Sequence, residues 1–222
     1  MVISRRAVRG TFLGAAMVNS LALGTTGCGG ADDEAAKVLD VAVAGTELCG
    51  GETVSANAAK SLKVITGASR FEGSGEEGTV ANAARKLGEA FVSSSTGHGD
   101  VCRIYAPDDE LRITWRLSGS TPVDAPAAAK FTVLNMGEWA LTATDGSFLR
   151  FGCRSGELTG VEPAHIEIGV EPGGMPKEPE GDPEAVKGAY ATVAHSFSLA
   201  MAGELGCENN GGLPETPDLT PK

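Results

Sequence analysis

Apolar residues recur every three or four positions in two segments near the beginning of the chain, residues 54–66 and 79–94. The repeating positions are Ala58, Leu62 and Ile65 in the first segment, and Val80, Ala84, Leu87 and Phe91 in the second. This spacing places the apolar side chains on one side of a helix. We therefore predict two amphipathic helices, the first of which ends at Gly67.

The period changes to two in the middle of the chain. Between residues 111 and 117, Leu, Ile and Trp alternate with Arg112, Thr114 and Arg116, which is the pattern of a strand with one buried face. Similar runs predict further strands at residues 101–106, 131–135, 139–144, 147–153 and 164–170. Asp145-Gly146 joins two of these strands in a tight hairpin turn. We expect a mostly antiparallel sheet of about six strands.

A third helix is predicted to begin near Asp182-Pro183, because Asp caps helices and Pro suits the first helical turn. Its apolar face consists of Val186, Tyr190, Val193, Phe197, Met201 and Leu205. The order of elements is then helix, helix, strands, helix. This order favours an α+β fold, in which two N-terminal helices and one C-terminal helix pack on one face of the sheet.

Composition and charge exclude several classes of function. The chain has 222 residues and a formal net charge of -11, and no basic block follows the first ten residues. Nonspecific binding to nucleic acid therefore has no electrostatic basis. No apolar run reaches the roughly 18 residues that a transmembrane helix needs, so attachment to a membrane would require a different anchor.

The first 27 residues resemble a bacterial export signal, with a basic start at residues 4–9, a weakly apolar centre at residues 11–23, and small residues before Cys28. Thr26-Gly27-Cys28 also resembles the lipobox of bacterial lipoproteins, although Thr25 replaces the usual Leu. The resemblance implies that Cys28 receives a diacylglyceryl group and becomes the mature N-terminus. Acyl chains would then hold the protein on the outer face of the cell membrane.

Two further resemblances concern export and family. Arg5-Arg6 resembles a twin-arginine signal, but Ala7-Val8-Arg9 replaces the usual Phe-Leu-Lys, so twin-arginine export and ordinary secretion both remain open. Residues 49–117, with a cysteine before the first helix and another on a strand, resemble uncharacterised lipoproteins of high-GC Gram-positive bacteria. This second resemblance implies no activity.

We expect four parts in the chain: a signal peptide at 1–27, a lipidated tether at 28–47, a single α+β domain at 48–210, and a disordered tail at 211–222. The tether begins with Asp32-Asp33-Glu34 and includes a short strand at residues 38–43, and the tail holds three prolines. Removal of the signal would take away three arginines and no acid. The mature chain would keep 15 basic residues against 29 acidic ones, a net charge of -14.

Four cysteines remain once Cys28 is lipidated, and outside the cytoplasm four cysteines indicate two disulfides. Three pairings are available. We favour Cys49 with Cys102 and Cys153 with Cys207, because strand parity turns Cys102 and Cys153 toward the helices. The other two cysteines lie just before the first helix and just after the last one, so each bridge would join a helical end to the sheet.

The sequence carries no established catalytic motif, and we assign no catalytic residue, metal ligand or cofactor. Gly73 to Gly78 has the letters of a dinucleotide-binding loop, but two glutamates occupy the phosphate positions and the βαβ context is missing. His165 and Glu167 share a strand face, as metal ligands can. His98, in a glycine loop, and His195, on the last helix, are the candidate bases for an alternative function, a cell-envelope hydrolase.

Arginine gives the stronger indication of function. Strand parity predicts that five arginines lie on the sheet face away from the helices, namely Arg103, Arg112, Arg116, Arg150 and Arg154. Such a face can bind carboxylate or phosphate groups, or its arginines can be paired with neighbouring acids. We therefore expect a non-catalytic binding or envelope-interaction module whose partner is an anionic ligand or an acidic envelope protein.

Overall fold

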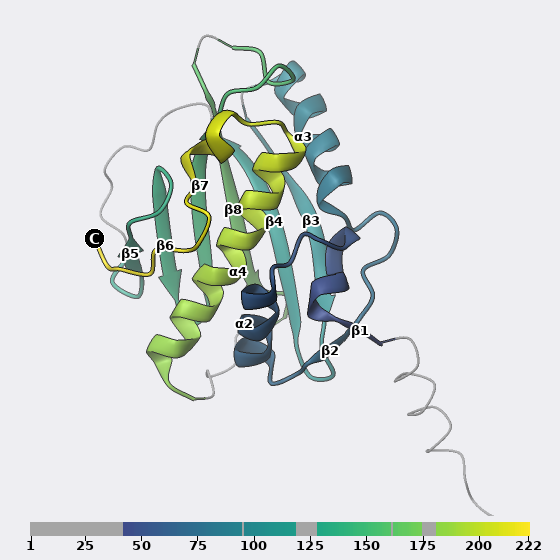
Figure 1. The fold of residues 1–222 in the computed structure, drawn as a ribbon, viewed down its shortest axis with the longest axis vertical. Helices are drawn as coiled ribbons and strands as arrows, with labels where there is room; N and C mark the ends of the chain where they lie inside the picture. Colours follow the sequence, from purple (N-terminus) through teal and green to yellow (C-terminus); the bar gives the residue numbers. More distant parts are fainter. Residues whose placement is uncertain (1–41, 95, 119–127, 161, 175–180) are drawn as a thin grey trace, which may run out of the picture.

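The computed structural model describes residues 42–94, 96–118, 128–160, 162–174 and 181–222, and it contains one eight-stranded antiparallel sheet (Figure 1). The strand order is β1-β2-β3-β4-β8-β7-β6-β5. The strands are β1 (Ala42–Ala44), β2 (Arg70–Glu72), β3 (Gly97–Tyr105), β4 (Glu110–Ser118), β5 (Thr132–Leu134), β6 (Trp139–Ala143), β7 (Gly146–Cys153) and β8 (Ala164–Pro172). The central neighbours β4 and β8 are far apart in the sequence.

Three α-helices cover one face of this sheet (Figure 1). They are α2 (Ala56–Thr66), α3 (Val80–Ser93) and α4 (Pro183–Glu204), and two short 3₁₀ segments, η1 (Gly45–Gly50) and η2 (Glu208–Gly212), lie beside them. None of the helices in the described ranges has the length and apolar content needed to cross a bilayer. The predicted α+β architecture, with the helices on one face, is confirmed.

The helix ends follow from local side-chain chemistry. Ser55 and Thr79 accept hydrogen bonds from backbone N–H groups in the first turns of α2 and α3, and Asp182 caps α4 ahead of Pro183 in the same way. Gly67 ends α2 with a positive φ of 71°, a conformation that costs glycine little. The sequence predicted the end of α2 at Gly67 and the start of α4 near Asp182-Pro183. It placed the starts of α2 and α3 at residues 54 and 79, one or two residues too early.

α4 is the central helix of the fold. It packs against β6, β7 and β8 and also against α2 and α3, and Phe197 and Met201 are fully buried. Ser196 links it to the segment before α2, because its hydroxyl accepts from the Ser55 amide at 2.9 Å and donates to the Thr53 carbonyl at 3.0 Å. The helix thus joins the helical layer to the sheet.

The strand count and the first domain boundary differ from prediction. β2 was missed because its three residues are too few to establish a period and only Phe71 is buried. The short strand predicted at residues 38–43 overlaps β1 at residues 42 and 43, but it was assigned to the tether. Since β1 and η1 belong to the folded domain, residues 42–47 are not part of a tether. The predicted signal peptide, Cys28 and the rest of the tether lie outside the described residues.

The predicted disordered tail at 211–222 is wrong. Leu213 is buried, and the end of the chain pairs with β5 through a bridge between Leu134 and Pro221. The Lys222 amide donates to the Val133 carbonyl at 2.9 Å. Three prolines suggested disorder, but proline lacks only its own N–H and can lie along a sheet edge.

Both disulfides have the pairing that the sequence favoured. Cys49 of η1 bonds to Cys102 of β3, with Cα atoms 5.9 Å apart. Cys153 at the end of β7 bonds to Cys207 after α4, with Cα atoms 5.0 Å apart. Each bridge joins one end of the helical layer to a strand, as expected.

Candidate functional site

Strand residues alternate between two environments, most regularly along β4, and this alternation creates the candidate site. Along β4, Leu111, Ile113, Trp115 and Leu117 are buried, whereas Arg112 and Arg116 are exposed. The buried residues face the helices, and no described helix packs on the opposite side. We call that opposite side of the sheet the open face. Its charged residues include Asp100 and Arg103 on β3, Arg112 and Arg116 on β4, Arg150 on β7, and Glu167 and Glu171 on β8.

Five residues of the open face form a continuous row across five neighbouring strands. His98 pairs with Arg116, Arg116 pairs with Glu167, Glu167 pairs with Arg150, and Arg150 pairs with Trp139. We call these residues the central row. Because directly opposed residues of antiparallel strands have adjacent side chains, this register brings two arginines to the same glutamate.

Glu167 is the buried centre of the row, with 7% of its surface exposed. The Arg150 guanidinium lies 3.0 Å from one carboxylate oxygen, and the Arg116 Nε atom lies 3.9 Å from the other. Arg150 also stacks over the Trp139 ring at 5.4 Å, which adds a cation–π contact. Removal of Arg150 would leave the carboxylate nearly buried and poorly compensated, which is strongly destabilising.

A second group of charges lies beside the central row. Arg112 contacts Asp100 at 2.6 Å, while Arg103 contacts Glu110 at 2.8 Å and Asp100 at 3.6 Å. The hydrogen bond to Glu110 is the main cause that raises the pKa of Arg103 above its ordinary value. In this group two guanidinium groups meet two carboxylates.

The structure therefore separates the five arginines that the sequence grouped together. Arg103 and Arg112 form one charge group, and Arg116 and Arg150 form another. Arg154 lies beyond the end of β7, where the strand parity used for the prediction no longer applies. It lines a pocket at the margin of the open face.

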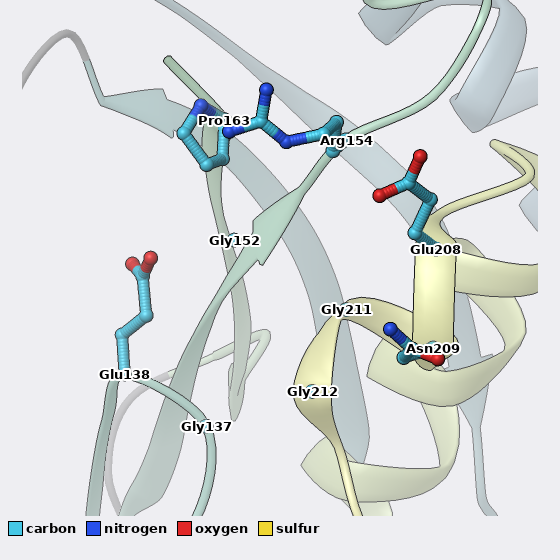
Figure 2. A pocket seen from close by; sticks show the side chains of 9 residues that line it. All are labelled: Gly137, Glu138, Gly152, Arg154, Pro163, Glu208, Asn209, Gly211 and Gly212. Atoms are coloured by element: carbon cyan, nitrogen blue, oxygen red, sulfur yellow. The ribbon is translucent and has the colours of Figure 1, made fainter.

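This pocket is open, has a volume of about 360 Å³, and lies where β6, β7, β8 and η2 come together. Figure 2 shows the Glu138 and Glu208 side chains on opposite sides of it, and Arg154 on a third side, with its guanidinium directed toward Pro163 in this view. The other lining residues are Gly137, Gly152, Pro163, Asn209, Gly211 and Gly212. The Cys153–Cys207 bridge holds two of the walls together, because Arg154 and Glu208 directly follow its cysteines and the Glu208 amide donates to the Arg154 carbonyl at 2.9 Å.

Glu138 connects the pocket to the open face. Its two carboxylate oxygens lie 2.9 and 2.8 Å from Nδ1 of His165. His165 and Glu167 share a face, as the sequence predicted, but they contact different partners. In the described part of the chain, no three His, Cys, Asp or Glu residues are grouped as metal ligands. The sequence did not indicate this pocket, because its lining residues come from segments far apart in the chain.

The two candidate bases occupy different environments. His195 is only 3% exposed, and its Nε2 atom lies 2.8 Å from the Pro214 carbonyl oxygen. Burial lowers the pKa of His195, and the hydrogen bond to Pro214 opposes this shift. His195 thus fixes the C-terminal segment and has little access to a substrate. His98 is exposed on the open face.

The loop at residues 73–78 has a structural role. It follows β2, where the sequence had predicted a preceding helix, but β2 pairs antiparallel to both of its neighbours and so forms no parallel βαβ unit. The Ser74 hydroxyl accepts from the Cys49 amide at 2.8 Å and lies 3.6 Å from the Cys49 sulfur. The loop therefore supports the first disulfide.

Comparisons of this chain with protein-family models, with curated proteins and with solved structures found no match.

Proposed function

We propose that this protein is a non-catalytic binding module, anchored by lipid at Cys28 to the outer face of the cell membrane, and that it binds its partner through the open face. The observation that carries the proposal is the central row, in which Arg150 and Glu167 are fixed by mutual contact on a sheet face that no described helix covers. A preformed charged surface of this kind binds with little reorganisation.

The two disulfides support the proposed location, because such bridges persist outside the cytoplasm. The anchor and the export signal rest on the resemblance of residues 1–28 to a lipoprotein signal. Anchoring by acyl chains requires no membrane-spanning helix. The outward-facing domain would then meet ligands or proteins of the envelope.

The environment of His195 favours binding over hydrolysis. A general base must reach the proton that it removes, and His195 is buried against the Pro214 carbonyl. The neighbouring hydroxyls of Ser196 and Ser198 donate to backbone carbonyls. A hydrolytic activity that disappears in His98→Ala would contradict the non-catalytic assignment.

Photo-crosslinking in intact cells tests the binding face. A benzophenone amino acid replaces Tyr105, an aromatic residue on the open face that is 39% exposed, or Val92 on α3, which is 83% exposed. We expect a discrete adduct from position 105 and none from position 92. Equal adducts from both positions, or an adduct at 105 that survives Arg116→Glu, would overturn the proposal.

Two controls complete this experiment. Arg85→Glu reverses an exposed arginine on α3 and should leave the adduct at position 105 unchanged. Incorporation of labelled palmitate should be lost in Cys28→Ser. Palmitate that persists in this variant would contradict the proposed anchor while leaving the binding face to be judged by the crosslinks.

A further inference from the structure

The two charge groups of the open face differ in balance. Around Asp100 and Glu110, two arginines meet two carboxylates. Around Glu167, two arginines meet a single carboxylate. Arginine stays protonated at any physiological pH. The ion pairs of the central row therefore carry one positive charge in excess.

This excess charge is accessible at Arg116. The Arg150 side chain is 12% exposed and lies 3.0 Å from Glu167, so it provides most of the compensation for that carboxylate. The Arg116 side chain is 65% exposed and its Nε atom is 3.9 Å from Glu167. A guanidinium has five N–H donors, and one long contact through Nε leaves its outer edge available to a ligand.

His98 adds a second donor beside Arg116. The two residues are directly opposed in the β3–β4 ladder, which places their Cβ atoms roughly 5 Å apart on the same face, and His98 is exposed. The nearby acid Asp100 is engaged elsewhere, since it contacts Arg112 and Arg103. The Arg116 guanidinium and the His98 imidazole therefore lie side by side. The buried Glu167 carboxylate positions the guanidinium.

We propose that Arg116 and His98 form an oxyanion subsite, which binds the phosphate or carboxylate group of an otherwise uncharged ligand. This inference rests on the proposed function and specifies its ligand. Arginine and imidazole donors suit such groups, because a hydrogen bond to a charged group is stronger than one between two neutral groups. A highly acidic partner is disfavoured, because the chain itself has a net charge of -11 and Arg103 and Arg112 are already neutralised.

Anion titration of the full chain, isotopically labelled and purified in neutral detergent, tests the subsite. The NMR signals of the Arg116 Nε group and the His98 ring are followed during addition of sodium phosphate, and separately of sodium acetate, at constant ionic strength maintained with chloride. We expect saturable shifts with at least one of these oxyanions. The arm that saturates at lower concentration identifies phosphate or carboxylate as the preferred group.

Two matched variants localise the effect. Arg116→Gln should weaken oxyanion binding by about tenfold or more, which corresponds to about 1.4 kcal/mol. Arg112→Gln changes an arginine on the same strand and face, also paired with an acid, and should leave the affinity within about twofold. His98→Gln provides a second test at a side chain that lies outside the ion pairs of the row.

The inference is overturned if chloride alone reproduces the shifts, or if Arg112→Gln and Arg116→Gln weaken binding equally. It also fails if the captured partner is an acidic protein that needs Arg103, Arg112 and Arg116 to the same extent. A crosslink at position 105 without any oxyanion binding would overturn the subsite and leave the proposed function standing. Oxyanion binding without a crosslink would overturn the proposed function and leave the subsite standing.

Discussion

Gly99 lies directly opposite Trp115 in the β3–β4 ladder, and a Cβ atom at position 99 would be 2.8 Å from the indole nitrogen. The indole is 4% exposed and occupies the space that a side chain at 99 would need. Its N–H has no hydrogen-bond partner within the described structure. The pair therefore depends on close packing between ring and backbone.

Gly99→Val should lower the free energy of unfolding by about 1 to 3 kcal/mol, because overpacking displaces the Trp115 ring. Urea denaturation followed by Trp fluorescence measures the change. Gly88→Ala is the control, since a Cβ at this position of α3 meets no atom within 4 Å. Alanine in a helix should stabilise by about 0.5 to 1 kcal/mol. Changes of the same sign in both variants would refute this interpretation.

Replacement of Cys153 and Cys207 together by serine should lower the free energy of unfolding by about 4 kcal/mol, since the bridge spans 54 residues. It should also speed hydrogen exchange at the Glu208 amide, which is bonded to the Arg154 carbonyl. The matched variant replaces Cys49 and Cys102, which span 53 residues. The Cys49 and Cys102 double variant should show a similar decrease in the free energy of unfolding. Equal acceleration at Glu208 in both variants would show that the second bridge does not hold the pocket.

Acidification should destabilise the fold partly through His195. Burial lowers its pKa below the ordinary value of 6.5, so the unfolded state binds the proton more readily than the folded state. The contribution of His195 to stability is complete above about pH 6.5 and falls as the pH drops toward the folded pKa. Urea midpoints should decline less in His195→Gln than in the wild type between about pH 7.5 and about pH 5.5. Identical declines would contradict this linkage.

The C-terminal segment should exchange hydrogen slowly at two amides. Lys222 donates to the Val133 carbonyl at 2.9 Å, and Asn135 donates to the Thr220 carbonyl at 3.3 Å. Deletion of residues 218–222 should therefore accelerate exchange at Asn135 and leave Ile113, in the middle of β4, protected. Mass spectrometry with peptide-level resolution distinguishes these positions. Fast exchange at Asn135 in the intact chain would restore the prediction of a disordered tail.

The sequence predicted most elements of the fold, because most of them are encoded locally. Val80, Ala84 and Leu87 establish a helical period within α3 itself, and all three are buried as expected. The disulfide pairing was also predictable, since strand parity and helix ends limit which cysteines can meet. The three-residue strand β2 was not predictable, because Phe71 is its only buried residue.

The arrangement of charges could not be predicted in the same way. Parity correctly turned Arg112, Arg116 and Arg150 away from the helices. Glu167, the partner of Arg116 and Arg150, meets both only because β8 lies between β4 and β7. No local sequence pattern determines the order of strands that are far apart in the chain. For the same reason the pocket could not be predicted, because Glu138 and Glu208 line it together only after the chain has folded.

The two disulfides also determine how this chain would respond to mechanical force. They enclose separate segments with sequence separations of 53 and 54 residues, which together make up about half of the 222 residues. If the anchor at one end and a load at the other pulled the domain apart, neither segment would lengthen. The extensible part would be the middle of the chain, from β4 to β7, together with the ends, so the covalent links would halve the distance over which the unfolded protein could be stretched.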